Sequence, residues 1–206
     1  MNEIIEMFSK IRIIPVVTIH NAEDANPLAN ALLEGGIPCA EITFRTSAAE
    51  NVLQILSRRD DILLGAGSVL NTAQAEKAVE NGARFIVSPG LNSKVVEYCV
   101  DRNIPVIPGT CTPTDFTQAL EYGLTVVKFF PAEVMGGIRA LKAMSAPFPM
   151  LKFIPTGGIN PQNVKDYLNL PQVMACGGSW MVKADLLKEK NFEKIRYLVR
   201  EAVNHL

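Results

Sequence analysis

The sequence contains little of what metal sites, nucleic-acid interfaces and membrane spans are made of. It has two histidines, His20 and His205, and none of its four cysteines belongs to a Cys-x-x-Cys pair. A zinc site needs three or four converging His, Cys or carboxylate ligands, and because no segment has that spacing we predict no metal. The net charge of −1 and the lack of a basic run argue against a nucleic-acid partner. No apolar run approaches the roughly 20 residues of a membrane span, so no membrane partner is expected.

The cysteines and the first residues bear on the compartment. Cys39, Cys99, Cys111 and Cys176 mostly lie in apolar surroundings, which predicts buried free thiols in a reducing cytoplasm. The first six residues carry acids where a signal peptide carries bases, so we expect no export. With 206 residues, the chain is expected to form one domain or at most two small ones.

Apolar β-rich segments alternate with amphipathic helical segments along the whole chain. The predicted strands are 13–19, 39–45, 62–68, 85–89, 105–110, 125–132, 152–157 and 173–180. The predicted helices are 22–34, 48–59, 72–81, 93–102, 113–122, 137–144, 161–168 and 192–204. Near-continuous apolar strands indicate a parallel sheet that is buried on both faces. Eight strand–helix units without a linker predict a single (β/α)₈ TIM barrel domain over residues 1–206, with an open doubly wound sheet as the alternative.

Local signals mark where several helices begin and end. The expected helix stops are Gly35-Gly36, Gly82 and Gly123. The expected helix caps are Asn71, Asn92, Thr112 before Pro113, and Asn160 before Pro161.

A lysine stands in the middle of the sixth predicted strand. Desolvating an ammonium costs several kcal/mol, so Lys128 needs a reason to be there. It either reaches water or a carboxylate from a strand end, or it loses its proton in an apolar socket and becomes a nucleophile. An ordinary lysine is neutral in only about one molecule in a few thousand at pH 7, so imine chemistry requires such a socket.

The second predicted strand carries two charges on one face. Glu41, Thr43 and Arg45 alternate, and side chains two residues apart share a face of a strand. Glu41 and Arg45 can simply form an ion pair. Opposite a buried Lys128, however, Arg45 offers a fork for a substrate carboxylate and Glu41 can move protons.

Glycine-rich turns follow the third, seventh and eighth predicted strands. The turns at 157–158 and 177–179 stand where such barrels often bind phosphate, because glycines let backbone N–H groups approach an anion. Tight left-handed turns are the alternative explanation. The segment 65–70 is interpreted as a tight turn between strand and helix, with Ser68 as a hydroxyl in the site.

Six segments together resemble the 2-keto-3-deoxy-6-phosphogluconate (KDPG) / 4-hydroxy-2-oxoglutarate (KHG) aldolase family. They are EITFRT at 41–46, GAGSVL at 65–70, SPGL at 88–91, VKFFPAE at 127–133, PTGGI at 155–159 and GGSW at 177–180. The resemblance covers essentially the whole chain, and the segments agree in order and in position within the barrel. It departs at Ser68, where the family often has threonine, and in the stretch 109–112 around Cys111.

The resemblance implies a class I aldolase without metal or other cofactor, usually a homotrimer, that acts on a small-molecule keto acid phosphate. Lys128 would form the imine and Glu41 would be the general acid and base. The residues that would bind substrate are Arg45 and Thr156 for the pyruvyl part, Ser68 and Pro89 for the pocket wall, and Gly158, Gly178 and Ser179 for the phosphate.

The expected reaction is cleavage of KDPG to pyruvate and glyceraldehyde 3-phosphate, and also of KHG to pyruvate and glyoxylate. Cleavage of the galactonate epimer of KDPG is an alternative within the same chemistry. A phosphosugar isomerase, epimerase or decarboxylase that forms no imine is an alternative outside it. A barrel that binds phosphosugar without turnover is the third hypothesis.

Overall fold

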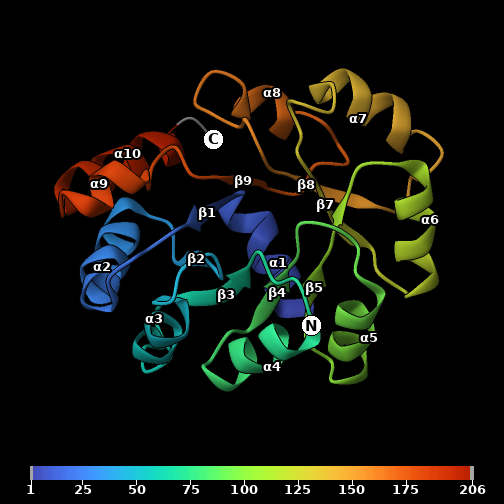
Figure 1. Cartoon of the computed structure of the whole chain (residues 1–206). Coiled ribbons are helices and arrows are strands. Elements are labelled where there is room, and N and C mark those ends of the chain that lie inside the picture. Colours follow the sequence, from blue (N-terminus) through green and yellow to red (C-terminus); the bar gives the residue numbers. More distant parts are fainter. Residues whose placement is uncertain (1, 205–206) are drawn as a thin grey trace.

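The apolar segments form parallel strands that close into a barrel (Figure 1). The computed structural model describes residues 2–204. The strands are β1 (Ile13–Val17), β2 (Cys39–Thr43), β3 (Leu63–Gly67), β4 (Phe85–Val87), β5 (Val106–Ile107), β6 (Gly109–Thr110), β7 (Val126–Phe129), β8 (Lys152–Pro155) and β9 (Cys176–Gly178). β1 pairs with both β2 and β9, and single bridges join β8 to the segment of β9. The predicted (β/α)₈ barrel is therefore confirmed, and the open sheet is excluded.

The fifth predicted strand is interrupted at Pro108. Proline has no backbone N–H to donate to a neighbouring strand, so the segment appears as β5 and β6 on either side of it. Its carbonyl is still used, since Lys128 N donates to Pro108 O at 3.0 Å. β5 pairs with β4 and β6 pairs with β7, so the two pieces together act as one of the eight strands.

The helices surround the strands and largely begin at the predicted caps. They are α1 (Asn2–Ile11), α2 (Ala25–Gly35), α3 (Ala49–Leu56), α4 (Thr72–Glu80), α5 (Ser93–Asp101), α6 (Pro113–Glu121), α7 (Gly137–Ser145), α8 (Val164–Leu168), α9 (Ala184–Lys188) and α10 (Phe192–Asn204), with a 3-10 turn η1 (Ala22–Asp24) before α2. The side chains of Asn71, Asn92 and Thr112 accept hydrogen bonds from the first turns of their helices, as predicted. Gly36 ends α2 with a left-handed φ of 100°.

Two helices were not expected, and several are shorter than predicted, α3 by four residues and α8 by three. α1 lies at the amino-terminal end of the barrel, where its Phe8 packs edge-on against Phe85 at 5.0 Å between ring centroids. α9 lies between β9 and α10. The predicted helix 161–168 begins only at Val164, because Asn160 forms a local turn in which its side chain accepts from Gln162 N. The cap predicted at Asn160 is therefore wrong.

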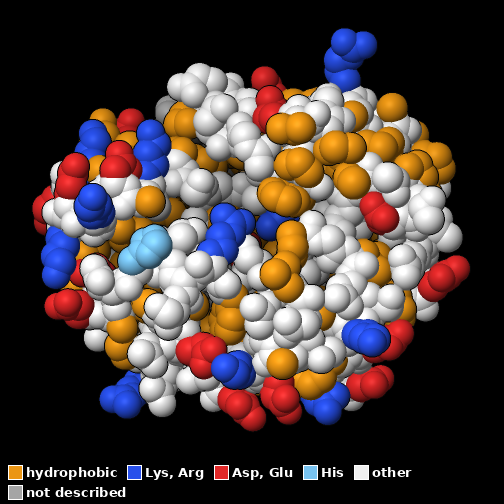
Figure 2. Space-filling model, viewed as in Figure 1, with side chains coloured by type: hydrophobic (Ala, Val, Ile, Leu, Met, Phe, Trp, Pro, Cys, Tyr) orange, Lys and Arg blue, Asp and Glu red, His pale blue; other side chains and the backbone are white. Residues whose placement is uncertain are grey.

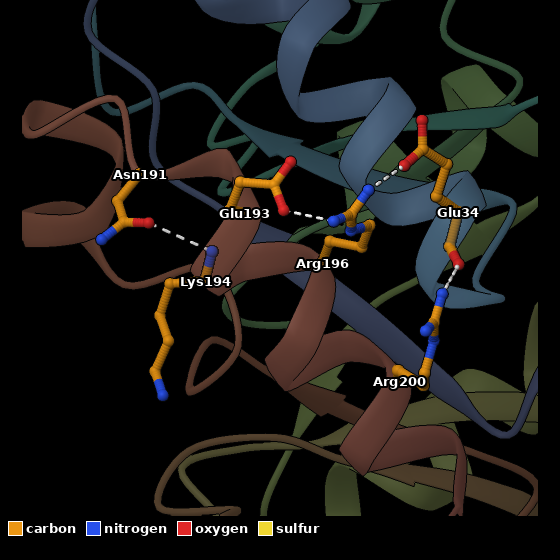
Figure 3. A network of polar contacts seen from close by, with 6 residues as sticks. All are labelled: Glu34, Asn191, Glu193, Lys194, Arg196 and Arg200. Atoms are coloured by element: carbon orange, nitrogen blue, oxygen red, sulfur yellow. Dashed lines mark hydrogen bonds and ion pairs between the residues drawn. The ribbon is translucent and has the colours of Figure 1, made fainter.

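The last helix returns to the first half of the chain and packs against α2. Polar contacts along this seam are drawn in Figure 3, where Arg196 bonds to Glu34 Oε2 at 2.8 Å and Arg200 bonds to Glu34 O at 3.2 Å. A Cβ on Gly35 would lie 2.4 Å from Val199 Cγ1, so the two helices approach closely only because residue 35 is glycine. The last helix thus lies against α2, and β1 pairs directly with β9.

Candidate active site

The carboxyl ends of the strands surround a cavity of about 170 Å³. Parallel strands direct all their carboxyl ends to one face of a barrel, and Figure 2 shows Lys or Arg side chains in a depression near the centre of one face. Two of the three glycine-rich turns, at 157–158 and 177–179, contribute to the lining. The lining residues are Val16, Thr18, Arg45, Phe130, Thr156, Gly157, Gly158, Ile159, Gly177, Gly178 and Ser179.

Lys128 and Glu41 face each other across the barrel interior. Lys128 on β7 and Glu41 on β2 are only 4% and 3% exposed, and Lys128 Nζ lies 3.8 Å from Glu41 Oε1. This is too long for a good hydrogen bond, and Glu41 Oε1 has no hydrogen-bond partner among residues 2–204. The Lys128 ammonium position lies 4.9 Å from the centre of the Phe130 ring. An amine and a carboxylate are thus buried together without being fully satisfied by the protein.

Gly67 makes room for the Glu41 side chain. The two residues lie on neighbouring strands, and a Cβ on Gly67 would stand 2.1 Å from Glu41 Oε1. Real Cβ atoms essentially never come that close. The glycine pattern at 65–67, which looked like a turn signal, therefore also serves to admit a carboxylate into the barrel.

Arg45 is held at the rim by Ser68. The Arg45 Nε donates to Ser68 Oγ at 2.7 Å, and Ser68 stands in the turn after β3 with a left-handed φ of 56°. Arg45 itself is exposed and lines the cavity. The structure brings these two predicted residues together, with the serine hydroxyl bound to the guanidinium.

The turn after β8 and the turn after β9 meet at the opposite wall. Thr156 is buried, and a Cβ on Gly177 would lie 2.4 Å from Thr156 Oγ1. Gly157 and Gly158 both have left-handed φ angles, of 97° and 82°. Within the described chain, the backbone N–H groups of Gly158 and Ser179 have no protein acceptor. Free amides of this kind at the mouth of a barrel suit an anion.

Four predicted site residues are absent from the lining of this cavity, namely the buried Lys128 and Glu41, Ser68, and Pro89. Pro89 is the one that lines another hollow. It does not line the cavity of about 170 Å³ but a separate, more open hollow with Leu70, Leu91 and Asn92. Its carbonyl packs against Gly109, where a Cβ would lie 2.0 Å from Pro89 O.

Four lining residues are absent from the predicted site, namely Val16, Thr18, Phe130 and Ile159. Thr18 follows β1, and its hydroxyl lies 3.0 Å from the buried Thr43 hydroxyl on the face of Glu41. The sequence does mark Thr18, because a polar residue inside an apolar strand segment is unusual. Phe130 was treated only as part of the lysine motif, yet its ring lies beside Lys128 and lines the cavity.

His20 lies outside this cavity. It is exposed and lines a hollow of about 390 Å³ with Asp24, Asp185 and other residues between η1 and α9. His205 lies outside the described residues. Across residues 2–204, no group of three or more His, Cys, Asp or Glu side chains is arranged to hold a metal ion. No described helix is long and apolar enough to cross a membrane.

The buried thiols fit the sequence prediction. Cys39, Cys99 and Cys176 are buried and Cys111 is partly buried, and all four are free. Burial raises the pKa of Cys99 and of Cys176 to about 12. Burial and the neighbouring Asp115 carboxylate raise the pKa of Cys111. These thiols are therefore poor nucleophiles.

Comparisons with known proteins agree on one family. The family model for KDPG and KHG aldolase matches residues 4–198. The 2-dehydro-3-deoxy-phosphogluconate aldolase of Treponema pallidum is 46% identical over 98% of this chain and 97% of that protein. The KHG/KDPG aldolase of Escherichia coli K12 is 41% identical over 93% of this chain and 90% of that protein.

A solved structure extends the likeness to three dimensions. The KDPG aldolase of Legionella pneumophila, with pyruvate captured as a covalent carbinolamine, superposes with a TM-score of 0.93. It is 42% identical, and the match covers 97% of both chains.

Proposed function

The chain belongs to the KDPG and KHG aldolase family, and from this we propose that it is a class I aldolase in which Lys128 forms an imine with a 2-keto acid. The proposed main reaction is cleavage of KDPG to pyruvate and glyceraldehyde 3-phosphate, with KHG, which gives pyruvate and glyoxylate, as a second substrate. One observation carries the proposal. It is the buried Lys128 amine 3.8 Å from a buried Glu41 oxygen that has no partner within residues 2–204.

The proposed reaction begins with addition to the ketone. The neutral Lys128 Nζ attacks C2, and the resulting carbinolamine loses its hydroxyl as water, with Glu41 supplying the proton directly or through a water molecule. The product of this step is a cationic imine at C2. A carboxylate that is buried but not bound by the protein is free to exchange protons with the substrate, which is why the unpartnered Glu41 oxygen suits this role.

The imine then makes the C3–C4 bond breakable. Glu41 accepts the proton of the C4 hydroxyl, the C3–C4 bond breaks, and its electron pair moves into an enamine with Lys128. Glyceraldehyde 3-phosphate leaves, and Glu41 returns the proton to C3. Water hydrolyses the pyruvate imine and frees Lys128. The imine nitrogen acts throughout as the electron sink.

Binding at both ends of the substrate would place C2 beside Lys128. Arg45, fixed by Ser68, offers a bidentate fork for the carboxylate, and Thr156 lines the same cavity. The free amides of Gly158 and Ser179, beside Gly178, are the proposed phosphate site. Positioning of this kind can supply several kcal/mol of barrier lowering. Pro89 remains a proposed member of the wider pocket wall.

Reductive trapping tests the proposal directly. The protein is incubated with pyruvate and borohydride, and its intact mass is measured. We expect one pyruvate adduct per chain, located on the peptide that carries Lys128. A folded protein that gives no adduct would remove the imine mechanism and favour a non-covalent phosphosugar enzyme or binding protein.

The proposal includes a homotrimer in the cytoplasm, acting in sugar-acid breakdown of the Entner–Doudoroff type. Free cysteines support a reducing compartment. Val134 and Met135, which precede α7, are 83% and 38% exposed, and Figure 2 shows hydrophobic side chains gathered where Figure 1 places α7. A second copy of the chain is the proposed occupant of this face. Light scattering should give the mass of a trimer, and Val134→Glu should lower it.

A further inference from the structure

Tyr167 and Glu133 form a polar pair that the mechanism above does not use. Tyr167 on α8 is fully buried, and its hydroxyl donates to Glu133 Oε1 in the segment between β7 and α7. Neither residue lines the cavity around Thr156 and Ser179. Burial is the main cause that raises the pKa of Tyr167, and the hydrogen bond to Glu133 raises it further. The phenol therefore keeps its proton and remains a donor.

Glu133 lies directly against the turn that carries the proposed phosphate amides. Glu133 N donates to Gly157 O at 3.1 Å, and Ala132 N donates to Thr156 O at 2.8 Å. A Cβ on Gly158 would lie 2.5 Å from Glu133 Cγ. The turn 156–158 therefore packs against both the backbone and the side chain of Glu133.

The carboxylate of Glu133 also lies at the start of α7. A Cβ on Gly137 would lie 3.0 Å from Glu133 Oε1 and 3.3 Å from the Tyr167 hydroxyl. A carboxylate is stabilised near the amino-terminal end of a helix. The Glu133 side chain therefore lies where three parts of the chain meet: the turn after β8, the start of α7, and α8. Tyr167 on α8 holds its carboxylate in place.

We propose that Tyr167 and Glu133 are positioning residues that keep the turn 156–158 in the shape that binds the phosphate. This inference rests on the proposed function of the same site. It predicts that the pair supports binding of phosphorylated substrates and has little effect on the imine chemistry at Lys128. The pair would then set the preference for KDPG over KHG, which lacks a phosphate.

Tyr167→Phe removes only the hydroxyl and tests the proposal by steady-state kinetics on the full chain. We expect the KM for KDPG to rise about tenfold, since a hydrogen bond to a charged group is lost. The kcat for KDPG and both constants for KHG should change less than about twofold. The matched control is Tyr122→Phe, which removes a tyrosine–glutamate hydrogen bond to Glu97 on the outside of the barrel and should leave all constants unchanged.

Substitutions of Glu133 provide a second test of the same proposal. Glu133→Gln keeps an oxygen that can accept from Tyr167, so its KM for KDPG should stay near that of the wild type. Glu133→Ala removes the acceptor, so its KM for KDPG should rise as much as that of Tyr167→Phe. If thermal melting shows that Tyr167→Phe does not fold, Glu133→Ala provides the test instead.

Equal losses on KDPG and KHG, or no change in KM for KDPG, would overturn the positioning role and leave the aldolase proposal intact. A wild-type protein that cleaves neither substrate would instead overturn the aldolase proposal.

Discussion

Lys128 Nζ and Glu41 Oε1 lie 3.8 Å apart inside the barrel, on strands that are not neighbours in the sheet. Each is buried to a degree that charged side chains rarely reach unless they are paired. Removing either partner from such a pair leaves the other group buried without compensation. The arrangement is therefore costly for stability, and it is the arrangement that imine chemistry requires.

Replacing Lys128 should abolish cleavage while the fold persists. For Lys128→Ala we expect turnover to fall by at least about a thousandfold, because no other group can form the imine. Lys128→Arg should be equally inactive, since a guanidinium does not lose its proton in proteins. Both are measured as pyruvate release, with circular dichroism as the control for folding. Turnover near that of the wild type in either variant contradicts the imine mechanism.

Replacing Glu41 by its neutral isostere should slow proton transfer. For Glu41→Gln we expect kcat to fall by about 10²- to 10⁴-fold, the usual contribution of a general acid or base. The matched control is Glu50→Gln, which removes a surface carboxylate paired with Lys77 and should leave kcat unchanged. An unchanged kcat in Glu41→Gln would show that another group moves the protons.

A methyl group at residue 67 should displace Glu41. The Cβ of Gly67→Ala would stand 2.1 Å from Glu41 Oε1, so the carboxylate must move away from Lys128. We expect kcat to fall by at least about tenfold, as misplacing a catalytic group does. Gly90→Ala is the control, because a Cβ there meets nothing within 4 Å. Equal activity in the two variants would mean that the position of Glu41 does not matter.

The buried thiol of Cys176 should make stability depend on alkaline pH. Burial raises its pKa from 9.0 to about 12, so the folded state holds this proton more tightly than the unfolded state. The contribution to stability is then complete below about pH 9 and is lost as the pH rises from 9 toward 12.

Urea unfolding of the wild type and of Cys176→Ala, compared between pH 8 and about pH 10.5, isolates this contribution. The cavity left by the substitution adds an offset that does not depend on pH. We expect the free energy of unfolding of the wild type to fall relative to that of Cys176→Ala as the pH rises. A constant difference between the two proteins would mean that the folded-state pKa of Cys176 is not raised.

Local sequence determined the elements and the face on which each side chain lies. Alternation placed Glu41 and Thr43 together on the inner face of β2, because side chains two residues apart in a strand share a face. The caps at Asn71, Asn92 and Thr112 were also predictable from local sequence, because each depends on hydrogen bonds within three residues. The apolar strands and their number predicted the barrel, with an open sheet as the alternative, and six motifs indicated the family.

Only the tertiary structure decided which of these faces meet. The distance between Lys128 and Glu41, and the joining of Thr18 to Thr43, depend on how the strands are staggered when the barrel closes. Pro89 was predicted in the pocket wall but lines a different hollow, and its carbonyl packs against Gly109. The contact of Tyr167 with Glu133 joins residues 34 positions apart in the chain. Local patterns fix side-chain direction over a few residues, whereas these contacts depend on the closure of all the strands together.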